Sequence, residues 1–333
     1  MKRILAAGLV LAGLTAPLAA QEVKELNFGI ISTESSAGLS KSFEPMLKDL
    51  EKAVGVPVKA FFAQDYAGVI EGMRFKKVDL AWYGNKSAME AVDRAGGEIF
   101  VQTTKPDGTK GYYSLIITNA DNNAVNNLKD VVDCSKGLTF GNGDPNSTSG
   151  NLVPSYYVFA LNKVDPNKCY KRVVVSNHEG NALAVANKQV DIATNNTESM
   201  DRLKDVRPAE AAKIKEVWRS PLIPSDPLVW RADLPADMKA KIYTFFLTYG
   251  RLGSDEEVAR QRAILAKTSD GWGTFVPSSN AQLYPIRQLE LFKTRLKVEA
   301  SDKLSADEKA KQLEEIDAKL AALDEQMKKV PSM

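Results

Sequence analysis

Short apolar runs with strand character alternate along the chain with segments whose apolar residues recur at helical spacing. Strands are predicted at 25–31, 56–62, 78–84 and 112–118. Between the first two, Phe43, Met46 and Leu50 share one face of a helix that ends near Gly55. Strands that alternate with helices pair in a parallel sheet, because each helix carries the chain back across the sheet. The sequence therefore predicts an α/β fold whose sheets are mostly parallel and flanked by helices.

The same alternation appears again after residue 137. Strands are predicted at 138–141, 172–176 and 191–194, and helices at 149–162 and 181–187. A chain of 333 residues is longer than one hydrophobic core usually organises, so we expect two lobes that the chain crosses twice. The expected division is a leader at 1–20, lobe 1 at 21–118, lobe 2 at 119–224, a return to lobe 1 with packing helices at 225–300, and a C-terminal helix at 301–333.

The first twenty residues have the layout of a secretory signal peptide. Lys2 and Arg3 precede an apolar stretch from Ile4 to Ala20, and polar residues begin at Gln21. The alternative is a membrane anchor, but an apolar core of about 15 residues is short of the ~20 that span a bilayer. We expect cleavage after Ala20 and a periplasmic mature protein.

Composition narrows the function classes. The 44 basic and 42 acidic residues give a net charge of +2, and loss of Lys2 and Arg3 with the leader would leave the two signs equal. A nearly neutral chain argues against nucleic-acid binding. One His and two Cys exclude His- and Cys-rich zinc sites, whereas counting does not exclude a carboxylate site for calcium or magnesium. We expect no metal and no cofactor.

The two cysteines precede two of the predicted strands of lobe 2. Cys134 lies four residues before the run 138–140, and Cys169 three residues before the run 172–176. If these strands are parallel neighbours, both cysteines lie at the same end of the sheet and can form a disulfide, which export permits. Two free thiols are the open alternative.

The C-terminal segment carries a different pattern. Ser305 and Glu308 have the spacing of a capping box. Apolar residues then recur three and four positions apart, as in a short heptad pattern, and we predict one long helix. Its stripe can dock on the protein's own body or pair with a second copy in a homodimer. The stripe comprises Leu313, Ile316, Leu320, Leu323, Met327 and Val330.

The segment 140–150 is the most promising ligand site. It joins a predicted strand to a predicted helix and contains Ser147, Thr148 and Ser149 but no Lys or Arg. Helix N-termini present free backbone N–H groups and favour anions, so an anion here would be held by neutral donors. The spacing fits neither a P-loop nor the dinucleotide fingerprint, since Asn146 occupies the third glycine position. A polar turn that merely caps the helix is the alternative.

Several stretches together resemble the phosphonate-binding periplasmic proteins of ABC importers, the PhnD family. They extend from about residue 25 to residue 292, and in combination they are highly specific. The resemblance implies a two-lobed periplasmic binding protein, similar to type II, with the ligand between the lobes. The matching stretches are Leu26–Glu34, Phe61–Gly68, Asp79–Asn85, Gly141–Gly150, Ala182–Asp191, Thr194–Glu198, Ser220–Pro227 and Pro285–Phe292.

The resemblance also implies roles for individual residues. Two carboxylates, Glu198 and Asp226, are assigned to an amine at the far end of the ligand. Each assigned residue has a structural alternative as a helix cap, a turn residue, a packed aromatic or a structural histidine. The residues assigned to phosphonate oxygens are Ser147, Thr148, Ser149, Tyr66, Tyr112 and His178.

The expected function is therefore capture of a phosphonate and its delivery to a membrane permease. Because two carboxylates suit an ammonium group, 2-aminoethylphosphonate or a similar aminoalkylphosphonate is the expected ligand. The alternatives are a receptor for phosphate, phosphite or simple alkylphosphonates, a phosphonate-processing enzyme, and a sensory or scaffolding protein that uses the C-terminal helix. If His178 binds as an imidazolium, affinity should rise as the pH falls toward 6.

Overall fold

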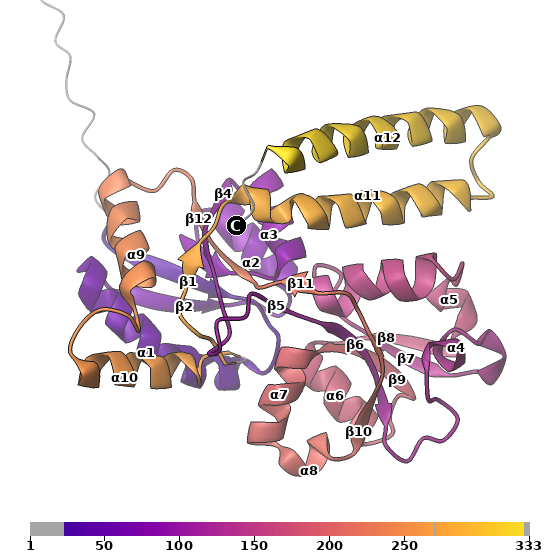
Figure 1. Ribbon diagram of the computed structural model, residues 1–333, viewed down its shortest axis with the longest axis horizontal. Coiled ribbons are helices and arrows are strands. Elements are labelled where there is room, and N and C mark those ends of the chain that lie inside the picture. The colour runs from indigo at the N-terminus through magenta and orange to yellow at the C-terminus, as the bar shows by residue number, and fades with distance from the viewer. Residues whose placement is uncertain (1–22, 270, 330–333) are drawn as a thin grey trace, which may run out of the picture.

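The computed structural model describes residues 23–269 and 271–329, which form two α/β lobes side by side (Figure 1). The predicted leader and Val330 lie outside the described residues. In the part of the chain that is described, no helix is long and apolar enough to cross a membrane. The predicted two-lobed α/β architecture is confirmed.

Lobe 1 is built on a six-stranded mixed sheet in the order β13-β4-β12-β3-β1-β2. Only β1, β2 and β3 pair in parallel, and the other strands pair antiparallel. The helices of this lobe are α1 (Ser36–Val54), α2 (Tyr66–Arg74), α3 (Asn85–Arg94), α9 (Ala236–Thr248) and α10 (Asp255–Leu265). Its strands are β1 (Leu26–Ile30), β2 (Val58–Phe62), β3 (Leu80–Trp82), β4 (Gly97–Gln102), β12 (Pro227–Arg231) and β13 (Val276–Pro277).

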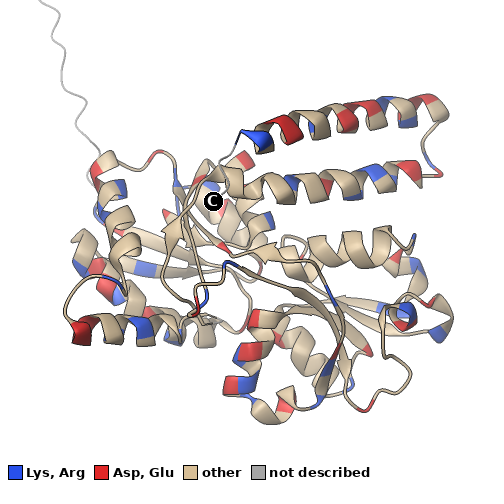
Figure 2. Ribbon diagram, in the orientation of Figure 1, with Lys and Arg blue, Asp and Glu red and all other residues tan. Residues whose placement is uncertain are grey.

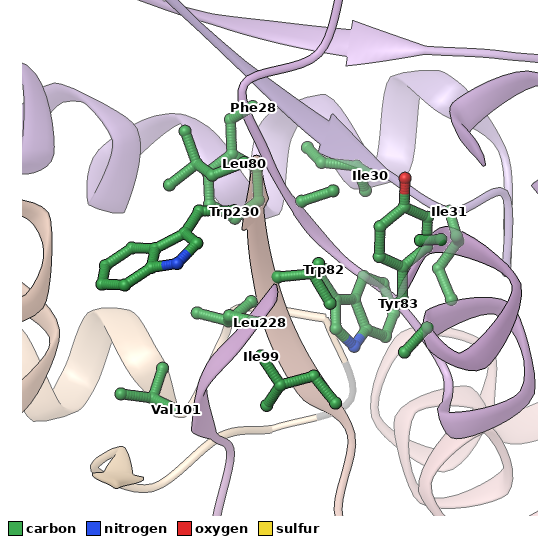
Figure 3. Packing of buried hydrophobic residues seen from close by; sticks show 14 of the residues in the cluster. Phe28, Ile30, Ile31, Leu80, Trp82, Tyr83, Ile99, Val101, Leu228 and Trp230 are labelled. Atoms are coloured by element: carbon green, nitrogen blue, oxygen red, sulfur yellow. The ribbon is translucent and has the colours of Figure 1, made fainter. Parts of the chain in front are cut away.

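Aromatic and branched side chains fill the centre of lobe 1. Phe28, Leu80 and Trp82 pack there with Leu228 of the returning strand β12 (Figure 3). Helix α1 covers the sheet and ends at Gly55, whose φ of 80° is the left-handed conformation that glycine adopts most readily. The helix therefore ends at the glycine where its predicted pattern stops.

Lobe 2 is built on a five-stranded sheet in the order β10-β6-β9-β7-β8. Strands β7, β8 and β9 pair in parallel, whereas β6 and β10 are antiparallel additions. The sheets are therefore mixed and not mostly parallel as predicted. The chain leaves lobe 1 through β4 and β6 and returns through β10 and β12 with no helix at either crossing, so the outgoing and returning strands pair antiparallel. The strands are β6 (Ser114–Asn119), β7 (Thr139–Asn142), β8 (Arg172–Val175), β9 (Ile192–Asn196) and β10 (Ile214–Arg219).

Two crossings join the lobes. A two-stranded ribbon of β5 (Gly111–Tyr112) and β11 (Ile223–Pro224) lies where the chain passes between them. Strand β6 already pairs with β9 in the second sheet, so the first crossing precedes Ser114, earlier than the expected boundary at residue 118. The return crossing lies at β11, next to the expected boundary at 224.

The helices of lobe 2 include one with wide, π-type turns. It covers η2 (Thr148–Leu152) and η3 (Ser155–Ala160) in the region predicted as a helix at 149–162. Such turns occur frequently at functional sites. The other helical segments are α4 (Leu128–Val131), η1 (Cys134–Lys136), α5 (Pro166–Cys169), α6 (His178–Ala186), α7 (Thr197–Val206) and α8 (Pro208–Ala211).

Cys134 and Cys169 form a disulfide, with their Cα atoms 4.6 Å apart. The strands that follow them, β7 and β8, are parallel neighbours, which is the condition that the sequence set for a bridge. Both cysteines precede the amino ends of these strands. The disulfide therefore lies at the amino ends of the strands, and the segment 143–150 lies at the opposite end, after the carboxyl end of β7.

The C-terminal segment folds back on the protein's own body. Helix α12 (Ala306–Lys328) begins with the predicted capping box and packs along α11 (Tyr284–Glu299) as a helical hairpin (Figure 1). Ile316 and Leu323 of the predicted stripe are buried, while acidic and basic residues are interspersed along the hairpin (Figure 2). The stripe packs within the chain and gives no support to a homodimer.

Candidate functional site

Most of the residues predicted to bind a ligand lie at the starts of helices, whereas Tyr112 lies on strand β5 and Asp226 directly before β12. Tyr66 is the first residue of α2, Thr148 of η2 and His178 of α6, and Glu198 is the second residue of α7. The first turn of a helix presents backbone N–H groups that have no partner within the helix, and it favours negative charge. This arrangement can hold an anion without lysine or arginine.

The turn before η2 is held by its own backbone and side chains. Ser147 caps the helix, its Oγ accepting from the Gly150 N–H at 2.9 Å. The N–H of Gly143 donates to the Gly150 carbonyl at 3.0 Å. A Cβ on Gly143 would lie 2.6 Å from the Gly150 backbone, so only glycine permits this approach. Ser147, Thr148 and Ser149 are all buried.

This turn of lobe 2 also caps two helices of lobe 1. Thr148 Oγ1 accepts from the Lys86 N–H at 2.8 Å at the start of α3, a helix whose N-cap Gly84 has no side chain to do so. Asp144 Oδ2 accepts from the Tyr66 N–H at 3.1 Å at the start of α2. The two lobes are therefore in direct contact at the predicted site.

His178 lies against the same turn, and the side-chain amide of Asn196 contacts both His178 and Ser149. The Asn196 Nδ2 is 3.1 Å from Ser149 Oγ and 3.3 Å from His178 Nε2. The imidazole is only 4% exposed, and burial lowers its pKa from 6.5 to about 4. The ring is therefore neutral near pH 7, which argues against the imidazolium alternative considered from the sequence.

The predicted amine-binding carboxylate Asp226 lies beside a tyrosine assigned to the phosphonate. Asp226 is buried and accepts from the Tyr112 hydroxyl at 3.0 Å and from Trp82 Nε1 at 3.2 Å. Burial above all, with the negative charges of Asp226 and Glu198, holds the pKa of Tyr112 well above 10. In this conformation the Tyr112 hydroxyl thus donates to Asp226, and the negative charge of the half-buried Glu198 also disfavours ionisation of the same phenol.

A second group of contacts joins the two lobes at another point. Arg202 of α7 forms an ion pair with Glu34 of lobe 1 at 2.6 Å and donates to the Ser269 carbonyl at 3.0 Å. Glu179 of α6 accepts from the Ser35 N–H at 3.0 Å. Contacts from α6 and α7 therefore join lobe 2 to the loop after β1 and to the loop after α10.

Three residues in contact with the site were not singled out from the sequence. Asp144, Asn196 and Trp82 hold Tyr66, His178 and Asp226 respectively. Each lies within a stretch that carries the family resemblance, which was the available signal. Among residues 23–269 and 271–329, no three His, Cys, Asp or Glu side chains are grouped to hold a metal ion.

Two surface hollows are formed by other residues. One of about 610 Å³ is lined in part by Tyr249 and Arg260, and another of about 440 Å³ in part by Tyr113 and Arg219. Neither is lined by a predicted ligand residue. The predicted ligand residues are instead mostly buried where the lobes meet. Their contacts, and not the surface hollows, therefore guide the functional assignment.

Comparison with known proteins gives the family of the chain. Residues 28–283 match the family model for the phosphonate periplasmic substrate-binding proteins of ABC transporters. The phosphonates-binding periplasmic protein of Escherichia coli K12 is 53% identical over 92% of this chain and 88% of its own length. The phosphate-import protein PhnD of Mycolicibacterium smegmatis is 29% identical over 79% of this chain and 84% of its own.

A solved structure shows the same fold. The binding component of an ABC phosphonate transporter from Pseudomonas aeruginosa superposes with a TM-score of 0.87 at 55% identity, covering 92% of this chain and 98% of its own. These relatives are substrate-binding components of transporters and not enzymes. The chain therefore belongs to the family of periplasmic phosphonate-binding proteins of ABC transporters.

Proposed function

We propose that this protein captures an aminoalkylphosphonate, with 2-aminoethylphosphonate as the expected ligand, and delivers it to the membrane permease of its transporter. The names of the Escherichia coli and Pseudomonas aeruginosa relatives support the phosphonate class. The observation that carries the amine is the placement of Asp226 and Glu198 around the Tyr112 phenol. A leader cleaved after Ala20 is part of the proposal, and N-terminal sequencing of the exported protein tests it.

The anionic end of the ligand would lie at the helix starts. Ser147, Thr148 and Ser149 supply hydroxyls, and His178 and Tyr66 supply a ring and a phenol from neighbouring helices. Hydrogen bonds from neutral donors to an ionised acceptor are stronger than bonds between neutral groups. A phosphonate can therefore be held here without a basic side chain.

The other end of the ligand would lie at the carboxylates. A Cβ on Gly84 would be 3.2 Å from Thr148 Oγ1 and 3.9 Å from Asp226 Oδ1, so the hydroxyl of the turn and the carboxylate both lie close to Gly84. A short ligand can span the separation between them. An ionised carboxylate only accepts hydrogen bonds, which an ammonium group provides and a methyl group does not.

Calorimetry on the mature chain tests this assignment. A charge-assisted hydrogen bond contributes about 1.5–3 kcal/mol, or about ten- to a hundredfold in affinity. We expect 2-aminoethylphosphonate to bind more tightly than methylphosphonate by such a factor. Glu198→Gln should reduce the preference while leaving methylphosphonate binding unchanged, and the remote Glu314→Gln on α12 is the matched control. Equal affinities of the wild type for the two ligands would overturn the amine assignment.

A receptor for phosphate, phosphite or simple alkylphosphonates is the second candidate. The Mycolicibacterium smegmatis relative is named for phosphate import, which favours this candidate. The same titrations separate the two, because a phosphate receptor would bind phosphate more tightly than either phosphonate and would be indifferent to Glu198→Gln.

A further inference from the structure

The orientation of the Asn196 side chain is fixed by a backbone donor. Asn196 ends β9 and caps α7, and its Oδ1 lies 2.7 Å from the backbone N of Ser199. A backbone N–H can only donate, so the amide oxygen must face it and the NH₂ group must face the other way. The side chain is 5% exposed, and no second orientation satisfies the Ser199 donor.

The NH₂ group then determines the roles of its two neighbours. It carries two hydrogens and accepts none, and it lies 3.1 Å from Ser149 Oγ and 3.3 Å from His178 Nε2. Both atoms must therefore accept. The Ser149 hydroxyl keeps its own hydrogen for another acceptor, and the neutral His178 ring carries its hydrogen on Nδ1.

The remaining donor on the ring is buried beside the predicted phosphonate turn. Among the described residues, His178 Nδ1 has no hydrogen-bond partner. A Cβ on Gly150 would lie 3.2 Å from His178 Cε1 and 2.8 Å from Ser147 Oγ, so the edge of the ring that carries both nitrogens faces the turn. A buried N–H without a partner is costly, and an anion at the turn would supply its acceptor.

We propose that Asn196 is a positioning residue that makes both Ser149 and His178 hydrogen-bond donors toward the ligand anion. The identity of that anion rests on the proposed function, whereas the hydrogen assignment does not. Ser149, His178 and Asn196 all belong to lobe 2, so the arrangement exists whether the lobes are open or closed.

The substitution Asn196→Asp exchanges the hydrogen-bond donor and acceptor roles between residue 196 and its neighbours Ser149 and His178, with little change in side-chain shape. Aspartate is also a good N-cap, and one of its oxygens can still accept from Ser199. Its second oxygen replaces the NH₂ group, so Ser149 and His178 Nε2 must now donate to it and turn their hydrogens away from the ligand. We expect affinity for 2-aminoethylphosphonate at pH 7 to fall by about ten- to a hundredfold.

The tautomer itself is measurable because His178 is the only histidine in the chain. A two-bond ¹H–¹⁵N spectrum of protein purified without a histidine tag reports one imidazole. We expect protonated Nδ1 and unprotonated Nε2 in the wild type at pH 7, and protonated Nε2 in Asn196→Asp. Recorded without phosphonate, the spectrum tests the inference separately from the proposed function.

The control is Asn127→Asp, which makes the same change at the exposed N-cap of α4 and should alter neither readout. A wild-type ring protonated on Nε2 would overturn the proposal, as would unchanged affinity in a folded Asn196→Asp variant. If Asn196→Asp does not fold, Asn196→Ser, which retains a capping oxygen but lacks the amide, must still lose affinity. A wild type that shows the Nδ1 tautomer but binds no phosphonate would refute the proposed function alone.

Discussion

The side chain of Thr148 in lobe 2 caps helix α3 of lobe 1, accepting from the Lys86 N–H at 2.8 Å. A residue of the predicted anion site thus makes a contact that exists only when the lobes are together. If Thr148 binds the ligand as proposed, ligand binding and lobe contact use the same hydroxyl, and the residue couples the two.

Thr148→Val should weaken ligand binding more than it weakens the fold. The change leaves the Lys86 N–H without its cap in the closed arrangement, which costs about 1–2 kcal/mol, and it removes one proposed ligand donor. We expect at least about tenfold lower phosphonate affinity by calorimetry, with little change in urea unfolding. Thr194→Val is the control, because Thr194 is buried and its hydroxyl has no partner among the described residues. Unchanged affinity in Thr148→Val would contradict the capping role.

The ion pair between Glu34 and Arg202 should stabilise the closed arrangement. It joins the lobes at 2.6 Å with both side chains mostly buried, and burial raises the pKa of Glu34 while Arg202 opposes the rise. A double-mutant cycle of Glu34→Gln and Arg202→Met, read as phosphonate affinity, should give a coupling of about 1 kcal/mol or more.

The matched control for that cycle is the exposed pair Asp121–Lys188, which lies within lobe 2 at 3.0 Å. Exposed pairs contribute little, so this second cycle should show almost no coupling. A coupling between Glu34 and Arg202 that appears in unfolding but not in affinity would mean that the pair supports the fold and not closure.

His178 should make the folded protein less stable in mild acid. Its pKa is about 4 in the folded chain, against 6.5 for an unburied ring. Between these values the unfolded chain binds the proton more tightly, so stability is full above pH 6.5 and falls by about 3 kcal/mol as the pH approaches 4. Urea unfolding of wild type and His178→Gln from pH 4 to 7 should show a shallower fall in the variant. Parallel curves would show that the ring is not held neutral.

Removal of the disulfide should lower stability without lowering affinity. Cys134 and Cys169 enclose a separation of 35 residues, for which chain entropy gives about 4 kcal/mol. The bridge lies at the amino ends of β7 and β8, away from Ser147–Ser149. Cys134→Ser with Cys169→Ser should therefore unfold at lower urea and bind phosphonate with wild-type affinity. If the double variant binds phosphonate clearly more weakly than the wild type under conditions in which both are folded, the disulfide shapes the site.

Local features of the fold could be predicted because they depend on neighbours in the chain. The end of α1 at Gly55, the capping box at Ser305 and the succession from β1 to β3 follow from backbone conformation, capping and hydrophobic periodicity. The family could also be predicted, since its motifs are short and contiguous.

Pairing between distant segments was beyond the same reasoning. The strand predicted near residues 112–118 is apolar and could be buried in either lobe. Only its pairing with β9 places it in the second sheet. Strands β4 and β10 and helices α7 and α10 lacked a clear pattern and were not predicted, because tertiary packing decides such segments.

The sequence by itself determined the kind of protein, the capped start of the last helix at Ser305 and the residue types at the predicted site. Only the tertiary structure decided which of those residues meet: Tyr112 with Asp226, Thr148 with Lys86, and Asn196 with both Ser149 and His178. The physical reason is range. Capping and periodicity act within one or two helical turns, whereas the roles of donors and acceptors at the site depend on side chains brought together from elements far apart in the chain.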